Sequence, residues 1–156
     1  MPRPLSRTRS NSDPEQVRAF TIECARTCSD MKCSDVKVLD VQGLSQVSDY
    51  IVVASGTSSR QMKSVAQALE DLGKERGEPP YRTNRDSGGT WVVADFVDVV
   101  IHLFEPEQRF YYDIEALWKT GARVEWRRPE ELERAARTAA TDADVDADAE
   151  DASPEA

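Results

Sequence analysis

Hydrophobic positions recur every three or four residues at the start of the chain and every second residue further on. This change of period predicts a helix followed by strands. The first helix begins at Asp13, a capping residue, with Pro14 suited to the first turn and Gln16 at capping-box spacing. Its apolar residues fall on one face, which we expect to be buried: Val17, Phe20, Cys24, Cys28 and Met31.

Two strands and a second helix follow. Residues 36–41 alternate, whereas residues 49–55 form a nearly continuous apolar run that is typical of a central strand covered on both faces. Ser58 and Gln61 have capping-box spacing and start a helix that ends near Gly77. Its predicted buried stripe is Met62, Val65, Ala66, Leu69 and Leu72.

A hairpin is predicted where residues 91–96 and 99–104 flank Val97 and Asp98, after a short edge strand within residues 81–89. Opposed residues of a hairpin share a sheet face. One face is then wholly apolar: Val92, Ala94, Phe96, Val99, Ile101 and Leu103. The other face is mixed: Trp91, Val93, Asp95, Val100, His102 and Phe104.

The mixed face admits two interpretations. Aromatic and polar side chains together are typical of protein interfaces. Alternatively, a further helix covers this face and His102 is a core histidine whose hydrogen bonds are satisfied.

A last helix is predicted from Glu105 and Pro106 to Gly121. At 100° per residue its buried stripe comprises Phe110, Ile114 and Leu117, flanked by Tyr111 and Trp118. Tyr112 then lies opposite this stripe, with Glu115 beside it and Lys119 behind it. An aromatic side chain on the polar face suggests one contact surface shared with the hairpin.

These elements predict one α/β (α+β) domain over residues 13–128, with a mixed sheet of about five strands and packed helices. Residues 1–12 and the acidic tail of residues 129–156 lack apolar periodicity and are expected to be disordered. We expect the tail to act as a solvating extension, although a functional arm stays open.

Charge is concentrated at the C-terminal end. The chain carries −9, and ten acidic residues against two arginines place −8 of this charge in residues 129–156. Residues 13–128 carry only −4, without the clustered Lys and Arg that phosphate binding requires. No direct sequence-specific contact with nucleic acid is therefore expected, and a protein partner is favoured.

Cysteine usage and hydropathy indicate a cytoplasmic protein with reduced thiols. The three cysteines, Cys24, Cys28 and Cys33, lie in one segment of a chain that starts without a secretory signal. No stretch is long and apolar enough to predict a membrane span. With His102 as the only histidine, the ligands for a metal site are too few, and no metal or other cofactor is expected.

Several blocks resemble the ribosomal silencing factors called RsfS, the Iojap family. The similarity extends in colinear order over roughly residues 17–125. The blocks are residues 49–56, Ser58, residues 60–61, 91–95 and 98–104, Arg109 and residues 112–118. Asp49, Gly56, Ser58 and Arg60 belong to the family-motif turn.

The resemblance implies a nucleotidyltransferase-like fold and a translational repressor without catalytic residues. The implied partner is the large ribosomal subunit, contacted through large-subunit ribosomal protein fourteen, so that joining of the small subunit is blocked when nutrients are scarce. The implied contact residues are Trp91, Asp95, His102, Phe104, Tyr112 and Glu115.

The sequence departs from the family pattern at two places. Asn84 and Arg85 stand where many members carry Glu-Gly, and Val97 stands at a turn that is often Gly. The loop at residues 82–90 is therefore expected to contact the partner differently, and the hairpin could contain a bulge.

An enzyme is the rival interpretation, because the turn from Gly56 to Ser59 could hold phosphates on its backbone amides. Asp95 and Asp98 are three residues apart, on opposite sides of a regular strand, so paired carboxylates for a divalent metal are missing. Catalysis is therefore not expected. Dimerisation through exposed hydrophobic surface, giving a homodimer, stays open.

Overall fold

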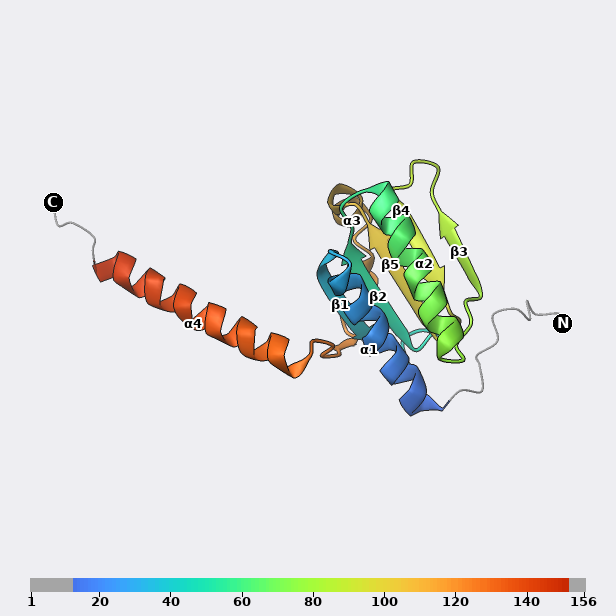
Figure 1. Cartoon of the computed structure of the whole chain (residues 1–156), viewed down its shortest axis with the longest axis horizontal. Coiled ribbons are helices and arrows are strands. Elements are labelled where there is room, and N and C mark those ends of the chain that lie inside the picture. Colours follow the sequence, from blue (N-terminus) through green and yellow to red (C-terminus); the bar gives the residue numbers. More distant parts are fainter. Residues whose placement is uncertain (1–12, 152–156) are drawn as a thin grey trace. The chain divides into compact units, whose positions relative to one another are not determined.

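The computed structural model describes the backbone of residues 13–151 and side chains as far as residue 141 (Figure 1). The chain divides into two compact units, Met1–Trp126 and Arg127–Ala156. The predicted disorder of residues 1–12 lies outside the described residues. The first unit contains α1 (Pro14–Asp30), β1 (Ser34–Asp40), β2 (Tyr50–Ser55), α2 (Ser59–Glu75), β3 (Arg82–Arg85), β4 (Trp91–Asp95), β5 (Val99–Phe104), α3 (Pro106–Tyr112), the 3-10 helix η2 (Ile114–Trp118) and β6 (Ala122–Arg123).

The helices α1 and α2 start at the predicted capping residues. The Asp13 carboxylate accepts a hydrogen bond from the Glu15 amide at 3.1 Å. The Ser58 hydroxyl accepts one from the Gln61 amide at 3.0 Å. These caps satisfy backbone donors that the first turn leaves free, so the local sequence defines where α1 and α2 begin.

The sheet has six strands in the order β3-β4-β5-β2-β1-β6. β2 and β5 pair in parallel, and the other neighbours are antiparallel. The predicted mixed α/β architecture is thereby confirmed, with β6 as an extra short edge strand. β2 lies at the centre with every residue buried, as its continuous apolar run predicts.

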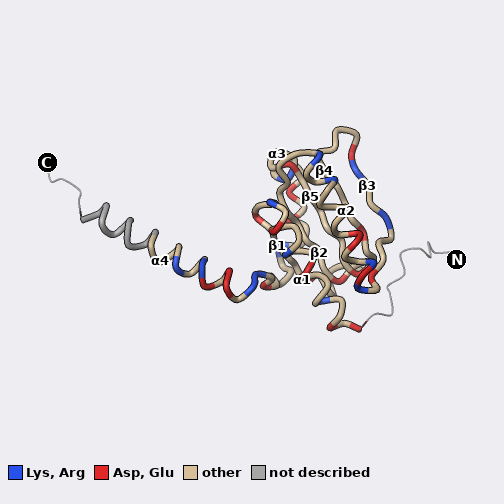
Figure 2. Tube along the Cα trace, viewed as in Figure 1, with Lys and Arg blue, Asp and Glu red and all other residues tan. Residues whose placement is uncertain are grey.

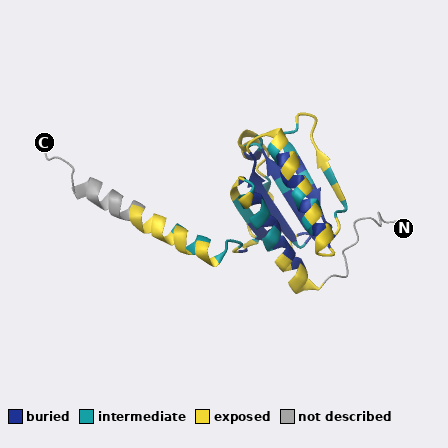
Figure 3. Ribbon diagram, in the orientation of Figure 1, coloured by how far each residue is buried: buried dark blue, intermediate teal, exposed yellow. Residues whose placement is uncertain are grey.

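The helices α1 and α2 lie side by side on one face of the sheet (Figure 1). The apolar hairpin face packs against them, and all six of its predicted residues belong to the main core. In Figure 3 the buried positions follow the strands and the inner sides of these helices. The Phe20 ring of α1 meets the Phe96 ring edge-on, with centroids 5.1 Å apart. The strand periodicity therefore identified the core correctly.

The hairpin has the predicted register, with Trp91 opposite Phe104 and Asp95 opposite Val100. Its strands pair without a bulge, so the alternative of a bulged hairpin is wrong. At the turn, Val97 has φ of 75° and the Asp98 amide donates to the Phe96 carbonyl at 2.9 Å. This is a γ-turn with a β-branched residue in the left-handed region, a conformation that favours glycine.

The described part of the second unit is one helix, α4 (Pro129–Asp151). The disorder expected for residues 129–156 stays a prediction. The expectation rested on the shortage of apolar residues that could pack, whereas alanine, glutamate and arginine all have high helix propensity. Within the described part of the chain, no helix is both long and apolar enough to cross a membrane.

Replacing Val97 with glycine tests the strain at the hairpin turn. Relief of a disfavoured φ contributes about 1–3 kcal/mol, and the flexibility of glycine in the unfolded chain costs about 0.5–1 kcal/mol. Loss of the half-buried Val97 side chain removes some packing and so reduces the net gain in stability. We expect Val97→Gly to be at least as stable as the natural chain in urea unfolding. Val97→Ala, which keeps the strain, should be less stable than both; an alanine variant equal to the glycine variant would contradict a strained turn.

Candidate functional site

The second face of the sheet carries a row of aromatic side chains at the open end of the β4–β5 hairpin, away from its turn. Four rings, Trp91, His102, Phe104 and Tyr112, form what we call the aromatic cluster. Trp91 lies at its centre, with its ring centroid 4.9 Å from Phe104, 4.7 Å from Tyr112 and 6.0 Å from His102. The hairpin register places the first three on one face, and α3 adds Tyr112.

A hydrogen bond orients two of these rings. The Trp91 indole N–H donates to His102 Nδ1 at 3.2 Å, so this nitrogen must be unprotonated. Burial lowers the pKa of His102 from 6.5 to about 4. His102 is therefore neutral at physiological pH, and the cluster presents rings without a positive charge.

The predicted contact residues divide into accessible and supporting groups. Tyr112 is 46% exposed, and Trp91, His102 and Glu115 are half-buried. Phe104 is fully buried beneath Trp91. Asp95 is buried too, and its carboxylate accepts a hydrogen bond from the Val97 amide at 2.9 Å.

The sequence left open that a helix covers the mixed face of the hairpin. The 3-10 helix η2 does cover part of this side of the sheet. Ile114 and Trp118 of η2 pack on a small second core. The buried members of that core are Leu39, Val41, Ile51, Val53 and Phe104. His102 is a hydrogen-bond acceptor within the cluster, yet its ring is not sealed from solvent.

The predicted continuous helix after Pro106 is wrong. α3 ends at Tyr112, and Asp113 adopts the left-handed conformation with φ of 44° and ψ of 49° before η2 begins. The predicted buried stripe assumed a constant 100° per residue, and the break rotates the later residues relative to the earlier ones. Of that stripe and its flanks, Phe110 is 88%, Tyr111 78% and Leu117 73% exposed.

Tyr112 is accessible, but not because it lies opposite a buried helix stripe, as predicted. It does not point away from the domain but packs against the Trp91 and Phe104 rings, at interplanar angles of 39° and 28°, while the residue stays 46% exposed. Ile114 and Trp118 are the only members of the predicted stripe and its flanks that pack on the sheet.

Arg109 anchors this region, a role that the sequence did not reveal. The guanidinium is buried; its Nε donates to Glu115 Oε1 at 2.7 Å. Nη1 donates to the Asp35 carbonyl oxygen at 2.7 Å and to the Ser55 hydroxyl at 2.9 Å. Nη2 lies 3.4 Å from the Asp35 carboxylate. One side chain thus joins α3 and η2 to the start of β1 and the end of β2.

Glu115 completes this ion-pair group. Its carboxylate also accepts a hydrogen bond from Lys37 at 3.0 Å. Burial by itself would raise the pKa of Glu115, but the hydrogen bonds and charges of Arg109 and Lys37 together outweigh it and lower the pKa. Glu115 remains ionised at neutral pH, paired with Arg109 and Lys37.

The family-motif turn lies next to the end of β5. The Gly56 amide donates to the Phe104 carbonyl at 2.7 Å, and a Cβ at Gly56 would collide with Met62. Only glycine therefore fits there. Ser58 caps α2, Arg60 is exposed, and the half-buried Asp49 donates its backbone amide to the Asp98 carbonyl at 2.8 Å.

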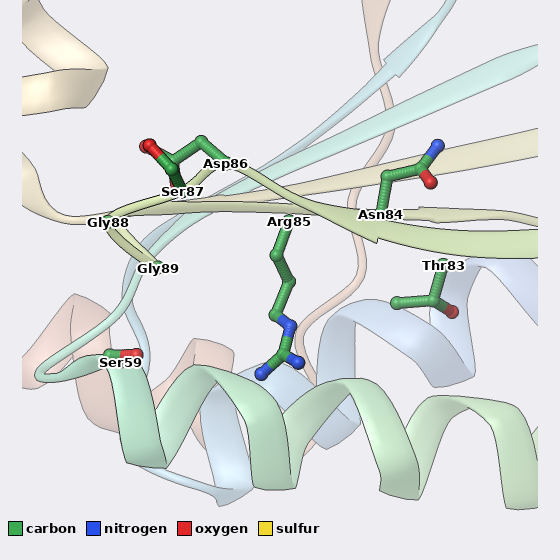
Figure 4. A pocket seen from close by; sticks show the side chains of 8 residues that line it. All are labelled: Ser59, Thr83, Asn84, Arg85, Asp86, Ser87, Gly88 and Gly89. Carbon is green, nitrogen blue, oxygen red and sulfur yellow. The ribbon is translucent and has the colours of Figure 1, made fainter.

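A polar cavity of about 540 Å³ separates the β3–β4 loop from the start of α2. Figure 4 shows Arg85 pointing from β3 toward α2, with Gly88 and Gly89 near Ser59. Arg85 and its loop are exposed, and acidic and basic residues are interspersed over the folded unit (Figure 2). No group of three His, Cys, Asp or Glu side chains that could hold a metal occurs among the described residues.

Comparison with known proteins identifies the family. A family model described as "RsfS: Ribosomal silencing factor during starvation" matches residues 14–153. The chain belongs to the ribosomal silencing factor family. A ribosomal silencing factor of Chromobacterium violaceum is 39% identical over 104 residues, which cover 67% of this chain and 83% of the relative. The chloroplastic protein Iojap of Arabidopsis thaliana is 32% identical over 120 residues, covering 77% of this chain and 50% of that protein.

Solved structures agree with this membership. A crystal structure of a Chromobacterium violaceum protein has a TM-score of 0.61 at 34% identity, covering 69% of this chain and 88% of that one. A Bacillus halodurans structure has a TM-score of 0.58 at 28% identity, covering 71% of this chain and 98% of that one. The resemblance stated from the sequence is thereby confirmed at the level of family and fold.

Substitution of Arg109 tests the anchoring role. Arg109→Met leaves Glu115 and the Asp35 carbonyl without their buried partner and should lower the free energy of unfolding by about 3 kcal/mol. Arg109→Lys should lose less, because an ammonium keeps the charge but not the fork of donors. Urea unfolding measures both. Arg60→Met, at an exposed arginine, is the matched control and should stay within about 0.5 kcal/mol of the natural chain; equal effects at both sites would contradict the assignment.

The depressed pKa of His102 predicts an acid-sensitive fold. Below pH 6.5 the unfolded chain binds a proton that the folded chain does not take up until about pH 4, so stability falls across this window as pH falls. Between pH 7 and pH 4.5 the contribution of this residue should be about 2 kcal/mol. His102→Asn supplies an acceptor that does not titrate. Unfolding curves at both pH values should show a smaller loss in the variant; identical losses would refute the linkage.

Proposed function

We propose that this protein is a translational repressor that binds the large ribosomal subunit and blocks its association with the small subunit under nutrient limitation. The proposed contact is large-subunit ribosomal protein fourteen. Family membership supports the general role. The observation that carries the specific site is the contact of the exposed Tyr112 ring with the Trp91 ring, whose centroids lie 4.7 Å apart.

The physical character of this surface suits a protein partner. Aromatic side chains give large contact area at low cost in conformational entropy, and they are enriched at interface centres. The rings are held by mutual stacking and by the Trp91–His102 hydrogen bond, so little ordering is needed on binding. With a charge of only −4, residues 13–128 offer no general attraction to ribosomal RNA.

Within this proposal the six predicted residues have two roles. Trp91, His102, Tyr112 and Glu115 contact the partner directly. Phe104 supports the Trp91 ring from below, and Asp95 holds the hairpin turn through the Val97 amide. The large subunit as target is also in line with one relative's name, "Mitochondrial assembly of ribosomal large subunit protein 1" of Mus musculus, 33% identical over 87 residues that cover 54% of this chain and 38% of that protein.

We further propose that the protein acts without catalysis, in the cytoplasm that holds the ribosomes. The rival function is nucleotide binding at the polar cavity beside α2. Its lining offers one arginine and one aspartate, whereas Asp95 and Asp98 are buried elsewhere in the hairpin. A calorimetric titration with magnesium and nucleoside triphosphate should give no binding heat; a clear isotherm would favour the rival.

Truncation of Tyr112 tests the proposed surface. Tyr112→Ala should cost about 1 kcal/mol of stability, because it removes the ring contacts with Trp91, Phe104 and Tyr111 from a half-exposed site. Subunit binding should lose about 2 kcal/mol or more, roughly thirtyfold in Kd. Co-sedimentation of the folded variant with purified large subunits measures this loss.

The control is Phe110→Ala on the same helix. Phe110 lies two residues away, about 200° round α3, and is more exposed than Tyr112. Its truncation should leave binding within twofold. Equal losses for the two variants, or recovery of the natural chain with small subunits as readily as with large ones, would contradict the proposed site.

A further inference from the structure

The end of α1 has a capping geometry that brings two cysteines together. Lys32 adopts φ of 81°, and its amide donates to the Ser29 carbonyl at 3.1 Å. The Cys33 amide donates to the Cys28 carbonyl at 2.9 Å. These two bonds, with a left-handed residue between them, define a Schellman motif in which Cys28 and Cys33 occupy the positions whose side chains normally make a hydrophobic contact.

In this protein these two positions carry cysteine thiols in place of the usual hydrophobic side chains. The Cys28 and Cys33 thiols belong to the same core cluster and influence each other's pKa. The bond from the Cys33 amide to the Cys28 carbonyl also keeps the two Cα atoms within about 7 Å, the upper end of the range that a disulfide spans. No large movement of the backbone is needed to join the sulfurs.

The two thiols differ in environment. Cys28 is fully buried, whereas Cys33 retains 8% exposure and receives a hydrogen bond from the Gln61 amide, with nitrogen and sulfur 3.5 Å apart. The hydrogen bond from Cys28, with a smaller contribution from Gln61, lowers the pKa of Cys33 to about 7. The same thiol hydrogen bond, together with burial, raises the pKa of Cys28. A substantial fraction of Cys33 is therefore thiolate at neutral pH.

We propose that Cys28 and Cys33 form a redox-active dithiol that peroxide oxidises to an intramolecular disulfide. In a reducing compartment, disulfides are usually transient and form between reactive thiols. Here the nucleophile Cys33 keeps 8% exposure and lies beside a fully buried thiol that can resolve the sulfenic acid.

The reaction balances with hydrogen peroxide as the oxidant. The Cys33 thiolate attacks one peroxide oxygen, the O–O bond breaks, and the departing hydroxide takes a proton to become water. The sulfenic acid on Cys33 is then attacked by the Cys28 sulfur; the S–O bond breaks, and the hydroxide leaves as water with the Cys28 proton. Two thiols lose two electrons, and peroxide is reduced to two waters.

Cys24 does not take part. It lies one helical turn before Cys28 and is fully buried. Burial, with the nearby Glu23 charge, raises its pKa well above the usual value. It therefore stays a packed thiol and gives an internal control for selectivity.

Peptide mapping of the full chain after brief peroxide treatment tests the proposal. Free thiols should fall from three to one per chain, and the intact mass should fall by two hydrogen atoms. Trypsin cuts after Arg26, Lys32 and Lys37, so Cys28 and Cys33 fall on separate peptides that only a disulfide can hold together. We expect this linked pair without reduction, no linked peptide containing Cys24, and an oxidation rate that rises through about pH 7.

Two variants complete the test. Cys24→Ala should form the same linked pair at the same rate, whereas Cys28→Ala should leave Cys33 as a sulfenic acid that a dimedone probe labels. Three thiols that persist in the folded natural chain, or a linkage through Cys24 as frequent as the one between Cys28 and Cys33, would overturn the proposal. These readouts require no ribosome, so they stand apart from the proposed function.

Discussion

The buried guanidinium of Arg109 lies where four segments of the chain meet, and the candidate surface depends on it. It joins Glu115 of η2 to the carbonyl of Asp35 in β1 and the hydroxyl of Ser55 in β2. Burying a charge costs free energy that its ion pairs and hydrogen bonds must offset, so these segments must keep their positions around Arg109 for the protein to fold. α3 is too short to be stable alone, and this anchor holds it against the sheet.

The consequence is a rigid aromatic surface at the rim of the sheet. With α3 fixed, Tyr112 rests on Trp91, which in turn rests on Phe104 and donates its indole proton to His102. Stacked rings that are already ordered lose little entropy on binding. The helix-covered face of the same sheet supplies the core. One sheet thus carries the main core on one face, and on the other a smaller core and the proposed contact surface.

The sequence predicted the regular parts of this molecule and missed the parts that depend on one backbone conformation. Alternation with a two-residue turn was enough to give the register from Trp91 to Phe104, because a slip by one residue would expose the core. The helix break at Asp113 was not predictable from periodicity, which assumes a constant angle per residue. The role of Arg109 was not predicted because two of its partners, Ser55 and Asp35, lie 54 and 74 residues away. The contact between Cys28 and Cys33 depends likewise on the left-handed Lys32.

Site-specific photo-crosslinking on purified large subunits tests the central claim most directly. A crosslinking amino acid would replace Tyr112 in one chain and Lys63, exposed on α2, in another. The account predicts that position 112 joins large-subunit ribosomal protein fourteen and that position 63 gives no ribosomal product. Crosslinks from position 63 alone, or from position 112 to another ribosomal component alone, would contradict it.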